Sequence, residues 1–204
     1  MPVNPSGMLL LAAQSLSLVR GGRELFCELS LEVYAGQLWQ IEGANGAGKT
    51  SLLRILCGLS RYGFEGKVLR HSRHLYVGHQ SAVKALLTPR ENLAWHVSGE
   101  RHNTNQKIEA ALAGVGLYGY EDVPSHTLSA GQHRRVNLAR LALSNSPLWL
   151  LDEPFTAIDK TGVAELQMLL VAHVEAGGAV VLTSHQALQV RCEVQTLNLD
   201  RVAA

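Results

Sequence analysis

The sequence predicts an α/β fold built around a parallel central sheet, and two kinds of segment carry that prediction. Short continuous apolar runs, "SPLWLLDEP" and "GAVVLTSH", are typical of strands that are buried on both faces of a parallel sheet. Other stretches place apolar residues at helical spacing, as in "TSLLRILCGL". Because strands alternate with helices along the chain, the pattern indicates the α/β class.

The individual elements follow in chain order. "LLLAAQSLSLVRGGRELFCELSLEV" predicts short strands with a turn at "RGGRE", and "QLWQIEG" predicts a strand that runs into a glycine-rich loop. The next helix is expected to begin near Lys49, with an apolar face formed by Leu52, Leu53, Leu56 and Leu59. "HLYVGHQ" predicts a further strand. From residue 81 to 129 the character changes to helix with polar loops, including "NTNQKIEAALAGVGL".

The composition sets broad limits on the class of protein. With 204 residues and a hydrophobic fraction of 47%, the chain fits one domain, with room for a subdomain. Its 18 basic residues nearly balance its 17 acidic ones, so a chain-wide basic footprint for nucleic acid is missing. No apolar run approaches the roughly 20 residues that span a bilayer. Cys27, Cys57 and Cys192 are odd in number and far apart, which favours a reducing compartment. We therefore expect a cytoplasmic protein that binds no nucleic acid and does not insert into a membrane.

The stretch "EGANGAGKTS" predicts a phosphate-binding loop. Gly43, Gly48, Lys49 and Thr50 have the spacing G-x-x-x-x-G-K-T between a predicted strand and a predicted helix. Glycines let backbone N–H groups approach phosphates, and the helix N-terminus adds its positive dipole end. Lys49 supplies a full charge to the β- and γ-phosphates, and Thr50 offers a hydroxyl to Mg²⁺. The expected nucleotide contacts are Gly43, Ala44, Asn45, Gly46, Ala47, Gly48, Lys49, Thr50 and Ser51.

Two later stretches predict the rest of a site. In "LSAGQ", residues 128–132, Ser129 is expected to cap the helix "QHRRVNLARLAL", and such a helix N-terminus is itself an anion site. The apolar run "LWLLDEP" ends in Asp152 and Glu153. A doubly buried strand keeps two carboxylates only where they project at its end into a site. Asp152 would hold Mg²⁺ through water, and Glu153 would act as the general base on the attacking water.

Together these stretches resemble the nucleotide-binding subunit of an ABC transporter over essentially the whole chain. "GANGAGKT" matches Walker A, "LWLLDE" matches Walker B, and "LSAGQ" resembles the family signature, usually LSGGQ. Residues 156–159 resemble the D-loop, Gln80 fits the Q-loop and His185 fits the switch histidine, all in family order. The resemblance implies a P-loop NTPase fold: one ABC-type nucleotide-binding domain, residues 1–204, with an antiparallel β subdomain. It also implies a helical subdomain, roughly residues 81–127, inserted between Q-loop and signature.

The same resemblance implies how the site is completed. Two copies stack head to tail and trap two ATP, so that Ser129 and Gly131, with Gln132 beside them, contact the nucleotide bound by the second copy. Gln80 would sense Mg²⁺ and the attacking water, and His185 would orient the γ-phosphate and that water. Asp159 would link the two sites across the interface.

The sequence departs from the family pattern at two points. Ala130 replaces the second glycine of the signature, and its methyl group narrows the approach of backbone to phosphate. Where the family stacks an aromatic ring on adenine, this chain has "LVRGGR", with Arg20 as the nearest match. A guanidinium plane can stack on a base, so Arg20 is the candidate adenine contact.

Several other residues are given structural roles. His71, His74 and His79 lack acidic or cysteine partners and are expected to be surface residues rather than metal ligands. The arginines of "QHRR", residues 132–135, are expected to face solvent or the nucleotide interface. The three tryptophans, Trp39, Trp95 and Trp149, are expected in the core. "TPRENLAW", residues 88–95, falls in the region where the family receives its membrane partner.

Longer stretches resemble a particular subfamily. "QIEGANGAGKTSLLRILCGL", "LSAGQHRRVNLARL" and "LWLLDEPFTAID" are similar to the CcmA-type ATP-binding subunit of bacterial cytochrome c maturation. That resemblance implies an ATPase of the haem-transporter type, using ATP and Mg²⁺, at the cytoplasmic face of the inner membrane. It implies a CcmB-type permease partner together with CcmC-type and CcmE-type proteins, and hydrolysis tied to release of the haem-loaded chaperone. The alternatives are an ABC subunit for another substrate, or a soluble non-transport ABC ATPase, which would need a long coiled coil or a second cassette.

Overall fold

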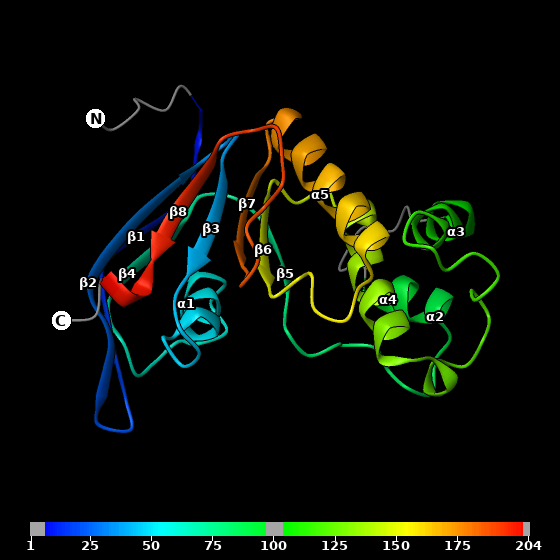
Figure 1. Ribbon diagram of the computed structural model, residues 1–204, viewed down its shortest axis with the longest axis horizontal. Coiled ribbons are helices and arrows are strands. Elements are labelled where there is room, and N and C mark those ends of the chain that lie inside the picture. Colours follow the sequence, from blue (N-terminus) through cyan, green and yellow to red (C-terminus); the bar gives the residue numbers. More distant parts are fainter. Residues whose placement is uncertain (1–6, 97–103, 202–204) are drawn as a thin grey trace. The chain divides into compact units, whose positions relative to one another are not determined.

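The computed structural model describes residues 7–96 and 104–201, and this part of the chain forms two compact units (Figure 1). Of the described residues, unit 1 comprises 7–76, 146–153 and 167–201. Unit 2 comprises 77–96, 104–145 and 154–166. Of the expected helical subdomain at 81–127, residues 97–103 lie outside the described residues, as does the first asparagine of "NTNQKIEAALAGVGL".

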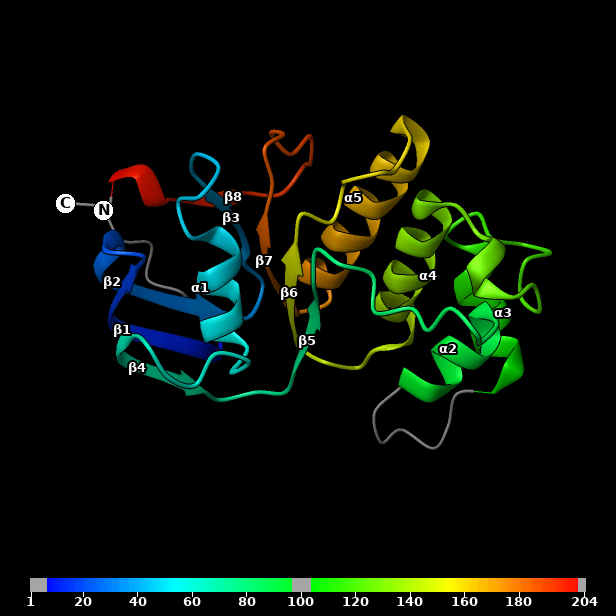
Figure 2. The same ribbon diagram turned by 90° about the horizontal axis from the view of Figure 1, so that it is seen from below.

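Unit 1 contains a three-stranded antiparallel sheet in the order β2-β1-β4 (Figure 2). β1 (Leu9–Arg20) and β2 (Arg23–Tyr34) form a hairpin, and β4 (Glu65–Arg70) pairs with the other edge of β1. The hairpin turn consists of Gly21 and Gly22, both with positive φ (58° and 76°), as a two-residue turn of type I′ requires. The predicted turn at "RGGRE" is therefore confirmed, although each strand has 12 residues and is longer than expected.

A second sheet of five strands has the order β5-β6-β7-β3-β8. Its members are β3 (Leu38–Glu42), β5 (His74–Val77), β6 (Leu148–Asp152), β7 (Ala179–Thr183) and β8 (Val194–Asn198). The pairs β3–β7, β3–β8 and β6–β7 are parallel. Every residue of β6 and β7 is buried, which is why these strands read as continuous apolar runs. The predicted α/β class with a parallel sheet is confirmed.

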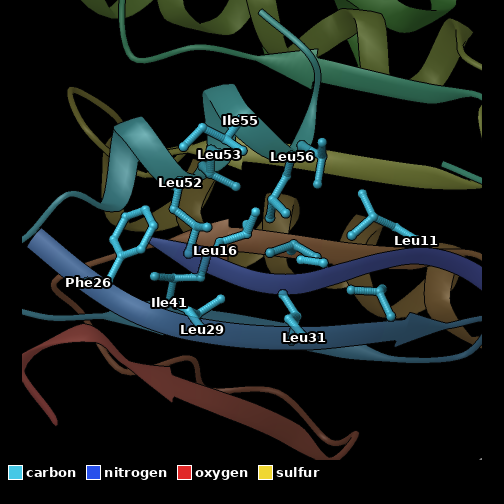
Figure 3. Packing of buried hydrophobic residues seen from close by; sticks show 14 of the residues in the cluster. Leu11, Leu16, Phe26, Leu29, Leu31, Ile41, Leu52, Leu53, Ile55 and Leu56 are labelled. Carbon is cyan, nitrogen blue, oxygen red and sulfur yellow. The ribbon is translucent and has the colours of Figure 1, made fainter. Parts of the chain in front are cut away.

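Helix α1 (Lys49–Leu56) supplies one side of the unit 1 core. Its Leu52, Leu53 and Leu56 have no exposed surface, and Figure 3 shows them beside Phe26 and the leucines of β1 and β2. The expectation for Leu59 was wrong, because its side chain is 65% exposed. The helix ends before Leu59, and Gly58, with a φ of 79°, turns the chain away.

Unit 2 is helical. It contains α2 (Pro89–His96), α3 (Asn105–Ala113), the 3₁₀ turn η1 (Ser125–Thr127) and α4 (Ala130–Leu143). These elements share a separate apolar core that includes Leu93, Ile108, Leu112 and Val136. Arg90 joins α2 to its neighbours, because its guanidinium lies 2.7 Å from Glu109 and 2.8 Å from Asp122.

Two expectations about unit 2 side chains were wrong. Trp95 is 70% exposed, with the Lys84 ammonium 4.1 Å from the ring centroid, whereas Trp149 is 3% exposed and Trp39 packs against the unit 1 core. Arg134 is only 5% exposed, so the first of its two expected locations, solvent, was wrong, and the second, the nucleotide interface, stays a prediction. Arg134 is buried because its guanidinium donates to backbone carbonyls, at 2.7 Å for the oxygen of Gly78.

The last described elements are helix α5 (Lys160–Glu175) and the 3₁₀ turn η2 (Leu199–Arg201). These two elements, and also β4 and β8, were not predicted from the sequence. Among the described residues, no helix combines the length and apolar character needed to cross a bilayer. Within the same residues, no group of three or more His, Cys, Asp or Glu side chains is arranged to hold a metal ion.

Candidate functional site

The glycine-rich loop of unit 1 connects the end of β3 to the start of α1. Gly43, Gly46 and Gly48 have φ values of 145°, 84° and 101°, which side chains other than glycine rarely adopt. At Gly48 a Cβ atom would also lie 3.2 Å from the Leu25 Cβ, so the close approach of β2 requires glycine there. The helix begins at Lys49, as expected, and its N-terminal N–H groups form an anion-binding end.

Lys49 lies across the loop that precedes it. Its ammonium donates to the carbonyl oxygens of Gly43, at 2.7 Å, and of Ala44, at 3.2 Å, and the residue is 8% exposed. A nearly buried ammonium that is held by neutral carbonyls is a strong partner for a phosphate, because it gains an opposite charge at little further desolvation cost.

Asp152 lies at the end of β6 and joins this loop to the neighbouring strand. Its Oδ1 accepts hydrogen bonds from the hydroxyls of Thr50, at 3.1 Å, and of Thr183, at 2.9 Å. The register of the parallel pair explains the second contact, because Asp152 lies opposite Thr183. Thr50 and Asp152 provide the hard oxygen atoms that Mg²⁺ prefers, and Mg²⁺ needs few such protein ligands when phosphates and water supply the others.

Glu153 follows with a strained backbone, since its φ is 49°. Its N–H donates to the Thr183 hydroxyl at 2.8 Å, and its Oε1 lies 3.4 Å from the His185 Nε2. The side chains of Glu153 and His185 are 18% and 52% exposed, so the pair is reachable from solvent. Two residues that were predicted separately are thus brought together.

Thr183 is a member of this cluster that the sequence reasoning missed. It is fully buried, and its single hydroxyl serves both Asp152 and the Glu153 backbone. The sequence does contain a signal for Thr183. Its hydroxyl lies at the end of the apolar run "GAVVLTSH" and needs a hydrogen-bond partner when it is buried. A neighbouring strand that ends in two carboxylates offers such a partner.

In unit 2 the predicted cap of α4 is present. The Ser129 hydroxyl accepts from the Gln132 N–H at 3.2 Å, and the Gln132 side-chain oxygen accepts from the Ser129 N–H at 2.9 Å, which makes a capping box. Gly131 packs closely on the segment at 156–159, since a Cβ there would lie 2.8 Å from the Ala157 oxygen. Ala130 begins the helix without disturbing the cap.

The remaining unit 2 candidates lie on segments that α4 holds. Arg135 donates to Asp159 at 2.6 Å, and Asp159 also accepts from the Gly162 N–H at the start of α5. Arg134 binds the carbonyls of Gly78 and His79, directly before the exposed Gln80.

The predicted residues therefore form two groups, each within one unit. Unit 1 holds residues 43–51, Asp152, Glu153, His185 and also Arg20, which is exposed at the end of β1. Unit 2 holds Gln80, Ser129, Gly131, Gln132 and Asp159.

This combination of a strand–glycine loop–helix, a buried aspartate followed by a strained glutamate, and a serine-capped helix defines an ATP-binding cassette. The model of the ABC transporter family matches residues 26–156. Three curated relatives, each named cytochrome c biogenesis ATP-binding export protein CcmA, come from Pseudomonas putida strain GB-1, Hahella chejuensis and Methylococcus capsulatus. In that order, their identities to this chain are 50%, 49% and 48%. The alignments cover 95%, 95% and 93% of this chain, and 98%, 97% and 98% of the relatives' own chains. The chain belongs to the CcmA family of ABC transporter ATP-binding proteins.

Solved structures confirm the fold. A dimeric ATP-binding cassette in a post-hydrolysis state with ADP and Pi has a TM-score of 0.76 at 24% identity, covering 87% of this chain and 88% of that one. A putative ABC transporter ATP-binding protein from Pyrococcus furiosus has a TM-score of 0.79 at 21% identity, covering 95% and 99%. The expected P-loop NTPase fold of the ABC type is confirmed, together with its antiparallel sheet.

Proposed function

We propose that this chain is the ATP-hydrolysing subunit of a membrane complex in c-type cytochrome biogenesis. One observation carries the hydrolytic part: the Thr183 hydroxyl joins Asp152 to the backbone of Glu153, whose carboxylate lies 3.4 Å from His185. The kinship with cytochrome c biogenesis ATP-binding export proteins supports the cellular role.

ATP is bound by residues 43–51. The N–H groups at the N-terminus of α1 face the phosphates, and the Lys49 ammonium exchanges its two carbonyl partners for phosphate oxygens. Arg20 stacks on the adenine ring in place of an aromatic side chain.

Magnesium fits the residues present. Thr50 and Asp152 already share a hydrogen bond at 3.1 Å and offer a hydroxyl and a carboxylate, with Gln80 as the third expected contact. When bound, Mg²⁺ neutralises charge on the phosphate oxygens.

Glu153 is the general base. Its carboxylate is positioned from both ends, since Thr183 fixes the backbone N–H and His185 lies beside the Oε1. The carboxylate accepts a proton from the attacking water, and the His185 imidazole orients the γ-phosphate and that water. The backbone strain at Glu153 is consistent with a side chain that is held for function.

The second half of each site comes from a second copy arranged head to tail. Ser129, Gly131 and Gln132 place the N-terminus of α4 against the γ-phosphate that the other copy holds, and Asp159 links the two sites. The capping box fixes that N-terminus, and the Arg135–Asp159 ion pair fixes the D-loop against α4. In each copy we assign residues 81–127, of which 81–96 and 104–127 are described, to the helical subdomain of the single domain.

The chain acts at the cytoplasmic face of the bacterial inner membrane, held by a CcmB-type permease that works with CcmC-type and CcmE-type proteins. The segment after Gln80 exposes two large apolar side chains, Leu86 at 91% and Trp95 at 70%, which suit a protein partner. Arg90 does not suit that role, because it is fastened to Glu109 and Asp122 within unit 2.

Two variants test the ATPase assignment. Glu153→Gln should bind MgATP normally and accumulate a closed dimer, with turnover lowered by about 10²- to 10⁴-fold, the usual range for loss of a general base. Lys49→Ala should weaken MgATP affinity itself in a titration. Glu193→Gln, at an exposed position of unit 1, is the matched control and should leave both quantities unchanged. Near-normal turnover of Glu153→Gln would remove Glu153 from the role of base.

A further inference from the structure

The 3₁₀ turn η2 lies against the start of the phosphate loop. The N–H of Ala44 donates to both carboxylate oxygens of Asp200, at 3.1 Å and 3.0 Å. The two residues are 156 positions apart in the chain. β8, which leads directly into η2, pairs with β3, which leads directly into the loop, so the sheet itself brings the two segments together (Figure 1).

The Asp200 side chain is exposed, but the turn that carries it is fixed. The preceding residue, Leu199, has no exposed surface and belongs to the unit 1 core. The Asp200 N–H donates to the Asn198 side chain at 2.9 Å, which fixes the turn. The turn lies in van der Waals contact range of the loop, because a Cβ on Gly43 would be 3.4 Å from both the Asp200 Oδ1 and the Leu199 Cβ.

We propose that Asp200 is a positioning residue that keeps residues 43–44 in their phosphate-binding shape while Lys49 changes partners; this proposal rests on the proposed ATP site. The Lys49 ammonium binds the carbonyls of the same two residues, Gly43 and Ala44. A phosphate that takes the ammonium releases those carbonyls. The bond from the Ala44 N–H to Asp200 then remains as a charge-assisted anchor on this segment.

Because Asp200 carries a negative charge, the direction in which its removal changes MgATP affinity tests the proposal. A carboxylate close to a polyphosphate repels it, so if electrostatics alone mattered, removal of Asp200 would tighten nucleotide binding. If Asp200 acts by holding the loop, its removal weakens binding, since the loop must be ordered at the expense of binding free energy.

The test is titration of the full chain with MgATP, together with steady-state ATP hydrolysis. Asp200→Ala should weaken MgATP affinity about three- to ten-fold, the size expected for one hydrogen bond that orders a binding loop. Asp200→Asn, which keeps an acceptor oxygen, should recover most of that loss. The turnover at saturating MgATP should stay within about two-fold, because Glu153, Thr183 and His185 are untouched and the effect is on binding alone.

Glu193→Ala is the matched control, since it removes one exposed acidic charge from the segment before β8 and should leave the affinity unchanged. Tighter or unchanged binding by Asp200→Ala, or equal weakening by Asp200→Ala and Asp200→Asn, would overturn the proposal. Thermal unfolding of each variant shows whether it is folded at the titration temperature. If the wild-type chain does not bind MgATP, the proposed function itself fails. If the wild-type chain binds MgATP and Asp200→Ala binds it equally well, only the role of Asp200 fails.

Discussion

Replacement of Thr183 by valine tests whether one hydroxyl organises the hydrolytic cluster. Valine has nearly the same shape as threonine, so the change removes little more than the oxygen at a fully buried position. That oxygen donates to Asp152 at 2.9 Å and accepts from the Glu153 N–H at 2.8 Å. The perturbation therefore acts on both carboxylate residues and leaves the phosphate loop in place.

The size of the effect follows from these two bonds. A hydrogen bond to a charged group contributes about 1.5–3 kcal/mol, and a buried N–H that loses its acceptor costs about 1–3 kcal/mol. Since Asp152 keeps its bond to Thr50, we expect a net loss of about 2–4 kcal/mol in the free energy of unfolding. For a chain of this size, about 2–4 °C in Tm per kcal/mol gives a decrease of about 4–16 °C.

Turnover should fall further than nucleotide affinity. Small displacements of a catalytic group can cost about 10²-fold in rate, and Glu153 loses the contact that fixes its backbone. We expect kcat for ATP hydrolysis to fall about 10- to 100-fold, with MgATP affinity within about three-fold of wild type, because residues 43–51 keep their contacts.

Calorimetric melting and an ATPase assay of the purified protein, with its membrane partner present, measure both quantities. Thr183→Ser, which keeps the hydroxyl, should retain most of the turnover. Thr196→Val, on an exposed position of β8, should change neither Tm nor kcat. The reasoning is refuted if Thr183→Val melts within a degree of wild type and hydrolyses ATP at the normal rate.

Three further predictions follow from the site and the packing. Ser129→Arg and Lys49→Ala should each lack ATPase activity, but verified mixed dimers should regain some of it, because one composite site is intact; no recovery would count against the head-to-tail arrangement. Trp95→Glu should move the protein from the membrane to the soluble fraction without loss of MgATP binding. Membrane attachment that persists when the permease is deleted would contradict this prediction. Arg90→Glu should instead lower Tm, because it places a third acidic side chain beside Glu109 and Asp122 in unit 2. Burial lowers the pKa of His173, which stacks on Trp149, so the unfolded chain binds the proton first and stability is lost as pH falls from about 6.5 through the lower folded pKa. His173→Phe should therefore reduce the decrease in Tm between pH 7.5 and pH 5.5. An unchanged decrease would show that His173 is not the source of this pH dependence.

The features that could be predicted from the sequence have local causes. The helix that begins at Lys49 and the one capped by Ser129 depend on residues within one turn, and the turn at Gly21–Gly22 depends on two glycines. The carboxylates at the end of β6 stand out because the preceding run is apolar. In each case the signal and the structure lie in the same short stretch.

The features that were missed depend on partners far away in the chain. β8 is a half-exposed strand with polar residues, and it is defined by its pairing with β3. Arg134 is buried because its acceptors come from residues 78, 79 and 154, and no neighbour in "QHRR" indicates them. Trp95 has apolar neighbours in sequence, but the side of α2 on which it lies is not covered by the unit 2 core. Asp200 reaches Ala44 only through the order of the sheet.

The assembly of c-type cytochromes in cells tests the central claim most directly. In a strain that lacks this chain, haem-stained gels of membrane fractions should show no c-type cytochromes, and the wild-type gene should restore them. Glu153→Gln, expressed at the same level and bound to the membrane, should fail to restore them, because ATP hydrolysis drives the process. Normal cytochromes in the deletion strain would contradict the role in cytochrome biogenesis while leaving the ATPase assignment in place, and full restoration by Glu153→Gln would contradict the account of hydrolysis at this site.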